Sequence, residues 1–320
     1  MAADPEFQPG AAPFGNFINY YSFNPPENRL RLLPAEFYTI ITRHSADRPL
    51  LGLDIGCNTG NLTAALWEQF SSHSTGDSPP DGTDSTTGTA AVQTNHARGC
   101  KDSTTGTSAA AVQTNHTPDC DNSATVPALQ TSSPPDGDTS TPASHTDFHM
   151  LGCDIDSVLI QRAVENNPHP AHLTFQTLDY MDPEQRQETL GSYLQRFGRT
   201  KFDVTFCFSV TMWIHLQNGD SGLMDFLRSV SGWTRFLLVE PQPWKCYRSA
   251  GRRLRKLGRD EFPRLRHLRI RSDVEKEMDR CLTEGCGMTR VGGFGETQWG
   301  RKLVLYRIRG DTVGTETGAV

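Results

Sequence analysis

The sequence lacks the features that mark secreted, membrane-spanning and zinc-structured proteins. Its eight cysteines are scattered, and none forms a CxxC pair or a Cys/His cluster with zinc-site spacing. The N-terminal stretch MAADPEFQPG has neither a basic region nor an apolar core, which argues against a secretory signal. No apolar run reaches the length of about 18 residues that crosses a bilayer. We therefore expect a cytoplasmic protein with reduced cysteines and no membrane partner.

The net charge of the whole chain is small, but positive charge is concentrated in one segment. The formal net charge is only −6 over 320 residues, which does not indicate a general polyanion-binding protein. Residues 245–271 nevertheless contain eleven Lys or Arg and only two acids, Asp260 and Glu261. Such a cluster attracts phosphate groups. Taken alone, however, such a cluster is explained better by a solvated helix face.

Large apolar residues are almost absent from residues 71–147, which consist mainly of Ser, Thr, Gly, Pro, Asp and Ala. The segment repeats itself, because DSTTGTAAVQTNH at 84–96 returns as DSTTGTSAAAVQTNH at 102–116. A segment that cannot bury apolar area cannot offset its ordering entropy, so we predict a disordered insertion. The predicted organisation is an N-terminal extension over 1–49, one domain over 50–310 that carries the insertion, and a disordered tail over 311–320.

The remaining sequence alternates apolar runs with amphipathic segments. Strands are predicted at 50–56, 149–156, 173–180, 202–210, 234–240, 287–294 and 302–309. Helices are predicted at 61–70, from 157 onward, at 183–197, at 219–231 and in the basic segment. Strands joined by helices indicate right-handed βαβ units and a mostly parallel sheet covered on both faces. The last two strands are close enough in sequence to form an antiparallel pair. The predicted fold class is therefore α/β.

Polar residues stand at the ends of the predicted parallel strands, which is where ligands bind in sheets of this kind. The first strand ends in DIGCNTG, where Gly56 and Gly60 allow a sharp turn and a close approach to a ligand. Asp154 ends the second strand. Without residues 71–147 it follows Asp54 by 23 residues, close to the spacing of about 20 residues at which an acid binds ribose hydroxyls. Asp179 ends the third strand.

This glycine pattern lacks the middle glycine at which a dinucleotide pyrophosphate touches the backbone, so it disfavours a nicotinamide dehydrogenase. S-adenosylmethionine carries an adenosine and an amino-acid end but no phosphate, and it fits the pattern better. Asp54 or a backbone group would receive its ammonium, Asp154 its ribose and Asp179 its adenine amino group. The alternative for Asp54 and Asp179 is that they cap neighbouring helices.

Several motifs resemble those of the Bicoid-interacting-protein-3 type RNA methyltransferases. They are GNFINYYSFNPPENRLRLLP (15–34), LDIGCNTGNLT (53–63), DIDSVLI (154–160), FCFSVTMWIHLQNGDSGL (206–223) and VEPQPWKCY (239–247). The resemblance covers the chain from Pro13 to about Arg307 apart from the insertion, and the pairing of TMWIHL with EPQPW makes it specific. WKCYR after EPQP is more similar to the branch that methylates RNA 5′-monophosphates than to the branch that caps a γ-phosphate.

The resemblance implies a seven-stranded, Rossmann-like class I methyltransferase, expected to be a monomer, that uses S-adenosylmethionine. The implied partners are small RNAs with a 5′-monophosphate, namely histidine transfer RNA and precursor microRNA. The implied cofactor contacts are Arg29, Asn58, Asp154, Asp179, Tyr180 and Phe208. The chain departs from the family at the insertion, which is predicted to lie away from the carboxyl ends of the strands. The alternative is an RNA-binding protein that has kept the fold and lost catalysis.

The implied reaction depends on alignment rather than on acid–base catalysis. A terminal phosphate is already an anion near neutral pH, because its second pKa is about 6. In-line positioning alone can supply roughly 7–11 kcal/mol. In EPQPW, Pro241 and Pro243 stiffen the turn, which we predict to project Gln242, Trp244 and Lys245 over the sheet edge. Lys245 would bind the phosphate, and Trp244 would stack on a terminal base or else pack within the fold.

Further candidates come from three segments around this turn. His215 would either donate to the phosphate or cap the next helix. The aromatic segment NFINYYSF would form a lid that brings Tyr20 or Tyr21 near the phosphate, or would pack as a helix on the domain; the resemblance favours the lid. Arg248 and Arg252 in the basic segment would hold the body of the RNA electrostatically.

Overall fold

A computed structural model describes residues 13–43, 48–74 and 147–310, and the statements below concern those residues. The predicted tail and almost all of the predicted insertion lie outside them. The N-terminal bound of the insertion is corrected, because residues 71–74 form the last turn of helix α4 (Asn61–Ser74). None of the helices in these ranges is long and apolar enough to cross a membrane.

The described residues contain one seven-stranded sheet with the order β3-β2-β1-β4-β5-β7-β6. Its strands are β1 (Leu50–Ile55), β2 (Phe148–Asp154), β3 (Leu173–Thr177), β4 (Phe202–Phe208), β5 (Thr234–Glu240), β6 (Met288–Glu296) and β7 (Lys302–Ile308). The first five strands pair in parallel, whereas β7 is antiparallel to both β5 and β6. The predicted mixed α/β sheet with an antiparallel C-terminal hairpin is confirmed.

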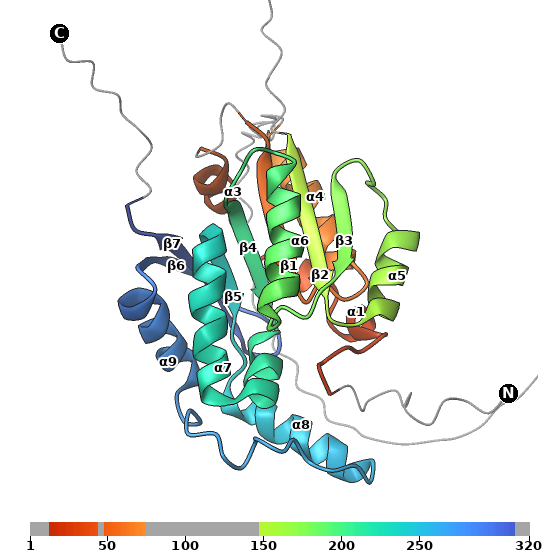
Figure 1. Cartoon of the computed structure of the whole chain (residues 1–320), viewed down its shortest axis with the longest axis vertical. Coiled ribbons are helices and arrows are strands. Elements are labelled where there is room, and N and C mark those ends of the chain that lie inside the picture. The colour runs from red at the N-terminus through yellow and green to blue at the C-terminus, as the bar shows by residue number, and fades with distance from the viewer. Residues whose placement is uncertain (1–12, 44–47, 75–146, 311–320) are drawn as a thin grey trace, which may run out of the picture. The chain divides into compact units, whose positions relative to one another are not determined.

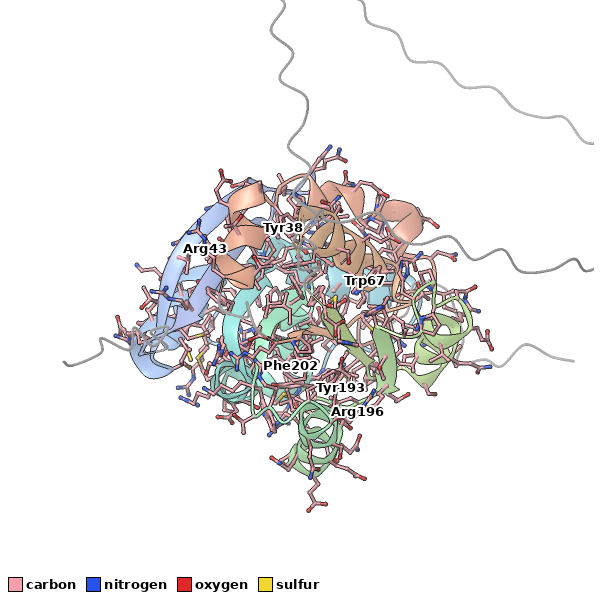
Figure 2. The ribbon with its side chains drawn as sticks, turned by 90° about the horizontal axis from the view of Figure 1, so that it is seen from above. Tyr38, Arg43, Trp67, Tyr193, Arg196 and Phe202 are labelled. Carbon is pink, nitrogen blue, oxygen red and sulfur yellow. The ribbon has the colours of Figure 1, made fainter. Side chains whose placement is uncertain are left out.

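Helices cover both faces of this sheet (Figure 1). One face packs against α3 (Ala35–Thr42), α4 and α5 (Ser157–Glu165). The other packs against α6 (Pro183–Gln195), α7 (Thr211–Trp233), α8 (Trp244–Lys256) and α9 (Val274–Arg280). Shorter elements are α1 (Tyr20–Phe23), α2 (Glu27–Leu30) and the π-helix η1 (Cys281–Gly285). In Figure 2, Tyr38 and Trp67 lie on one side of the sheet, opposite Tyr193 and Arg196.

Burial on both faces explains why the central strands are continuous apolar runs rather than alternating ones. In β1, Leu50 packs into the cluster formed with α3 and α4, whereas Leu51 and Leu53 pack into the opposite cluster. All three side chains are fully buried. Complete burial of each such side chain stabilises the folded state by about 1.5–3 kcal/mol. The apolar runs in the sequence therefore determine where the strands lie.

Two helices begin where the sequence did not predict a helix to begin. The helix predicted at 219–231 is the second part of α7, which already starts at Thr211 and is interrupted at Gly219 with φ 76°. The EPQPW turn opens directly into α8, because Pro243 is its N-cap and Trp244 its first residue. Trp244 and Lys245 therefore belong to the first turn of a helix rather than to a projecting loop.

The neighbours β1 and β4 mark the point at which the strand order reverses. In doubly wound sheets the connections on either side of this point lead to opposite faces, which leaves a crevice beyond the carboxyl ends of the strands. The short helix α1 and the start of α8 both lie at this end of the molecule (Figure 1).

Candidate functional site

A cavity of about 1100 Å³ lies at the carboxyl ends of the central strands. Its wall is formed by the N-terminal segment 13–24, the loop after β1, the end of β2, the loop after β4 and one side of α8. Arg301, from the turn between β6 and β7, completes it. Ligand pockets commonly enclose about 300–1,000 Å³, so this one has room for a cofactor together with part of a substrate.

The loop after β1 forms the floor of one end of the cavity. Gly56, Asn58 and Gly60 all have positive φ, at 77°, 53° and 79°. A Cβ atom on Gly56 would lie 2.8 Å from Cγ2 of Val210, so this position requires glycine. The turn directs the amide of Asn58 at Oδ2 of Asp154, over a distance of 2.9 Å. The end of β2 is thereby tied to the loop after β1.

Two acids, Asp54 and Asp154, line the same end of the cavity. Burial raises the pKa of each carboxyl to about 6, although hydrogen bonds oppose the shift. Asp54 accepts from Thr63 Oγ1 at 2.7 Å, and Asp154 accepts from the amides of Asn58 and Asp156. Buried carboxylates of this kind favour a cationic or hydroxyl-bearing ligand, which restores the interactions lost with water.

The N-terminal segment lies across these loops. The side-chain amide of Asn58 donates to the carbonyl of Phe17 at 3.0 Å, and that of Asn16 donates to Asp156 at 2.7 Å. The hydroxyl of Tyr21 donates to the carbonyl of Cys57 at 3.1 Å. The segment is thus a wall of the cavity, and it contains the short helix α1 as well.

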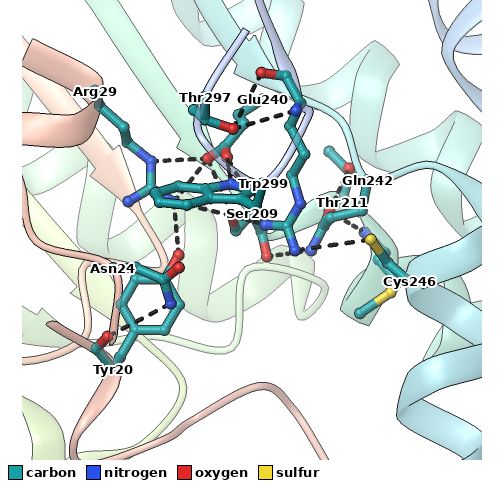
Figure 3. Close-up of polar contacts among 12 residues, drawn as sticks. Tyr20, Asn24, Arg29, Ser209, Thr211, Glu240, Gln242, Cys246, Thr297 and Trp299 are labelled. Atoms are coloured by element: carbon teal, nitrogen blue, oxygen red, sulfur yellow. Dashed lines mark hydrogen bonds and ion pairs between the residues drawn. The ribbon is translucent and has the colours of Figure 1, made fainter. Parts of the chain in front are cut away.

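A buried network of charges connects this segment to β5 (Figure 3). Arg29 donates through Nε to Glu240 Oε2 at 2.8 Å, and both side chains are fully buried. Through Nη2 it donates to Tyr20 Oη at 2.6 Å and to Ser209 Oγ at 3.0 Å. Trp299 Nε1 donates to the other carboxylate oxygen of Glu240 at 2.7 Å. Within the described ranges, Arg29 Nη1 has no hydrogen-bond partner.

Three cations line the end of the cavity formed by α8 and the β6–β7 turn, namely Lys245, Arg253 and Arg301. Arg301 donates to the hydroxyl of Ser209 and lies 3.7 Å from Glu240. The Nζ atom of Lys245 lies 3.4 Å from the position of a Cβ on Gly300, so Lys245 points toward the turn that carries Arg301. The guanidinium of Arg253 lies 4.8 Å from the ring centroid of Phe17.

The structure brings most of the predicted site residues together. Those that line the cavity are Tyr20, Tyr21, Arg29, Asp54, Gly56, Asn58, Asp154, Phe208, Gln242 and Lys245. Those that lie outside its lining are Asp179, Tyr180, His215, Trp244, Arg248 and Arg252. Sequence reasoning assigned no role to Ser209, Glu240, Arg253, Trp299 or Arg301. Ser209 and Glu240 could have been predicted as site residues, because they stand at the ends of β4 and β5.

Gln242 does not project from the EPQPW turn as predicted, because its amide is used within the fold. Its Nε2 donates to the carbonyl of Ser209 at 2.6 Å, and its Oε1 accepts from the Met212 amide at 3.0 Å and from Thr211 at 3.1 Å. The side chain is almost completely buried. Gln242 therefore joins the loop after β4 to the loop after β5.

His215, unlike Gln242, does not line the cavity. Its Nδ1 pairs with the hydroxyl of Tyr247 at 3.0 Å and its Nε2 with Asp220 at 2.7 Å. Burial lowers the pKa of the imidazole, although Asp220 opposes the shift. Trp244 stacks on Tyr247 with ring centroids 4.9 Å apart, and the guanidinium of Arg271 lies 5.7 Å from the Trp244 ring. Trp244 thus packs within the fold, which is the alternative that the sequence left open beside base stacking.

The other residues outside the cavity lining have local roles in the structure. Asp179 accepts from the amide of Met181 at 2.9 Å, and Tyr180 packs edge-on against Phe226. Arg248 and Arg252 are exposed on α8. None of these four residues lines the cavity, so a ligand would contact them only if it extended beyond the cavity lining.

A sheet of this order, with β7 inserted antiparallel beside β5, a glycine turn after β1 and an acid after β2, defines the class I methyltransferase fold. The family model described as Bicoid-interacting protein 3 (Bin3) matches residues 202–308. The chain is 42% identical to the RNA 5′-monophosphate methyltransferase of Bos taurus, an alignment that covers 94% of this chain and 82% of that protein. It is 40% identical to the pre-miRNA 5′-monophosphate methyltransferase of Xenopus laevis, with 95% and 96% covered. The chain belongs to the Bicoid-interacting protein 3 family.

Among solved structures, the N-methyltransferase NodS of Bradyrhizobium japonicum in complex with S-adenosyl-L-homocysteine resembles this chain at a TM-score of 0.43. The sequence identity is 13%, and the match covers 96% of this chain and all of that one.

Proposed function

We propose that this protein transfers the methyl group of S-adenosylmethionine to the 5′-monophosphate of small RNAs, with histidine transfer RNA and precursor microRNA as substrates. One observation carries the proposal: a single cavity is lined both by the buried acids of β1 and β2 and by cations of α8 and the β6–β7 turn. The names of its relatives in Bos taurus and Xenopus laevis support the same reaction class. A cytoplasmic location is part of this proposal, and the scattered cysteines of the sequence, which indicate a reducing compartment, support it.

The acidic end fits S-adenosylmethionine, which supplies an activated methyl group when it is bound. Asp54 would face the ammonium and Asp154 the ribose hydroxyls, while Phe208 offers an apolar wall. The unpartnered Nη1 of Arg29 supports the presence of a polar ligand here, because buried donors are rarely left without a partner. The left-handed turn at Asn58 brings the backbone close enough to contact such a ligand.

The cationic end fits a terminal phosphate. Lys245, Arg253 and Arg301 would hold its oxygens and orient one of them toward the methyl group, so that transfer is in line. No residue need remove a proton, because the phosphate is already ionised near neutral pH. Burial raises the pKa of Tyr21 well above its usual range, so this phenol stays neutral and acts as a donor rather than as a base.

Labelled methyl transfer to paired RNAs tests the proposal. The two RNAs share one sequence and differ only in a 5′-monophosphate or a 5′-hydroxyl, and we expect label on the phosphorylated RNA alone. Label on both would indicate a base or ribose methyltransferase. Label on neither, with RNA binding retained, would support the alternative of an RNA-binding protein that has lost catalysis. A histidine transfer RNA acceptor stem and a precursor microRNA are the RNAs to compare first.

A further inference from the structure

Three metal-ligating side chains lie at the amino ends of β2 and β3, away from the cavity at the carboxyl ends. Asp147 immediately precedes β2, His149 lies within it, and His172 immediately precedes β3. The parallel pairing of these strands begins with Met150 opposite Leu173, which places His149 and His172 side by side one position earlier. Asp147 and His149 are two residues apart, so their side chains project to the same side of the strand.

The donor atoms have the spacing that a metal ion requires. Oδ1 of Asp147 lies 3.0 Å from Nε2 of His149 and 3.6 Å from Nδ1 of His172, and all three ligand atoms lie within 4.8 Å of one another. Zinc binds nitrogen and carboxylate oxygen at about 2.0–2.2 Å, so two donors of a tetrahedral site lie about 3.3–3.6 Å apart. Small side-chain movements are therefore enough to accommodate the ion.

His172 provides an independent sign that a ligand is missing. Its Nδ1 atom is buried and has no hydrogen-bond partner in the residues that the structure describes. The 3.6 Å separation from Asp147 is too long for a hydrogen bond. An unsatisfied buried polar atom is unfavourable, and coordination to a metal ion would satisfy it.

The surrounding fold holds these residues in place before any ion binds. The carbonyl of Asp147 accepts from the amide of Leu50 at 2.7 Å, and that of His172 accepts from the amide of Met150 at 2.9 Å. The ring of Trp67, labelled in Figure 2, packs 5.0 Å from His172. Trp67 is itself anchored, because its Nε1 donates to the carbonyl of Phe148 at 2.7 Å. Supporting contacts of this kind orient metal ligands.

We propose that Asp147, His149 and His172 form a binding site for a divalent transition metal ion of the zinc class. Two imidazole nitrogens and one carboxylate favour zinc over calcium or magnesium, which prefer oxygen ligands. Three protein ligands leave a fourth position for water or another group. The ion would join the start of β2 to the start of β3, outside the methyl-transfer cavity.

Metal content measured on the full chain tests this site. Metal-free protein is incubated with Zn²⁺, dialysed and analysed for bound zinc, and its melting temperature is followed in parallel. The variants His149→Gln, His172→Gln and Asp147→Asn should each lose one equivalent of zinc relative to the unmodified protein. The matched control is His169→Gln. This side chain packs 4.1 Å from Trp67 and pairs with Glu68 but supplies no donor to the site, so the variant should retain the zinc.

The chain contains ten histidines and eight cysteines, which can bind zinc elsewhere. The test is therefore the difference in bound zinc between each variant and the unmodified protein. Equal zinc content in all variants, or no zinc in the unmodified protein, would overturn the proposal. The cobalt-substituted unmodified protein gives a second readout that needs no variant to fold. A spectrum of nitrogen and oxygen ligation is expected, whereas a thiolate-to-cobalt charge-transfer band would place the ion on cysteines and refute the site.

Discussion

Replacement of Lys245 by alanine tests the proposed phosphate site most directly. Lys245 is exposed in the first turn of α8, and within the described residues it has no ion pair or hydrogen bond through its side chain. Its Nζ atom points toward Gly300, beside Arg301. Because the substitution leaves no buried charge unpaired, we expect the free energy of unfolding to change by no more than about 0.5 kcal/mol.

The expected effect on methyl transfer is much larger than the effect on stability. A hydrogen bond to a charged group contributes about 1.5–3 kcal/mol, which corresponds to a fall of about 10- to 150-fold in kcat/KM. Activity should not disappear, because Arg253 and Arg301 still line the same end of the cavity. Affinity for S-adenosylhomocysteine should be unchanged, since Asp54 and Asp154 lie at the other end.

The assay is labelled methyl transfer to a 5′-monophosphate RNA at fixed salt, because affinities for nucleic acid depend on ionic strength. Lys256→Ala is the matched control, since it removes one lysine charge from the last turn of the same helix at an exposed position outside the cavity lining. Its long-range attraction is largely screened at physiological salt, so kcat/KM should fall by less than about threefold. Unchanged turnover in Lys245→Ala, or equal losses in both variants, would refute a direct phosphate contact.

Three further predictions concern the buried groups around the cavity. Glu240→Gln leaves Arg29 buried without its counter-charge, so denaturant titration should show a loss of about 3–5 kcal/mol in the free energy of unfolding; an unchanged midpoint would contradict this. Asp54 and Asp154, with pKa values of about 6, become protonated as the pH falls from 7 to 5, so S-adenosylmethionine should bind more weakly at pH 5 and should release protons on binding at pH 6. Calorimetry in two buffers of different ionisation enthalpy measures this release, and its absence would exclude both acids from the ammonium and ribose contacts. His215→Ala should lower stability by about 1–3 kcal/mol because it leaves buried partners unsatisfied; kcat at a permissive temperature should stay within a few-fold, and a loss of several orders of magnitude would restore a catalytic role.

The strands and their polar ends were predictable because each depends on local sequence. A run such as FLLVE must be buried on both faces, and it ends where Glu240 and two prolines interrupt it. The glycine turn was predictable for the same reason, since Gly56 and Gly60 mark positions where the backbone adopts positive φ. Because β1 and β2 are parallel, Asp54 and Asp154 lie at the same edge of the sheet, and this does not depend on the insertion between the two strands.

Contacts between distant segments could not be predicted in this way. Arg29 and Glu240 are 211 positions apart, and neither residue alone indicates that the other neutralises it. Arg301 reaches the cavity only because β7 runs antiparallel, which turns the loop before it toward the carboxyl ends of the parallel strands. Gln242 and His215 resemble exposed functional residues in the sequence, whereas the fold buries both and uses every polar atom.

The distribution of charged residues in the cavity suits the proposed reaction between a cationic sulfonium and an anionic phosphate. Methylation reduces the charge of a terminal phosphate from about −2 to −1, so an excess of cations would hold the product too tightly. Glu240 offsets part of the positive charge of Arg29 and Arg301, which leaves Lys245 and Arg253 without that counter-charge. Apolar side chains, Phe208 among them, also line the cavity and strengthen attraction between opposite charges by excluding water. In the proposed reaction the site would attract the dianionic phosphate more strongly than the methylated monoanion, which would favour release of the product.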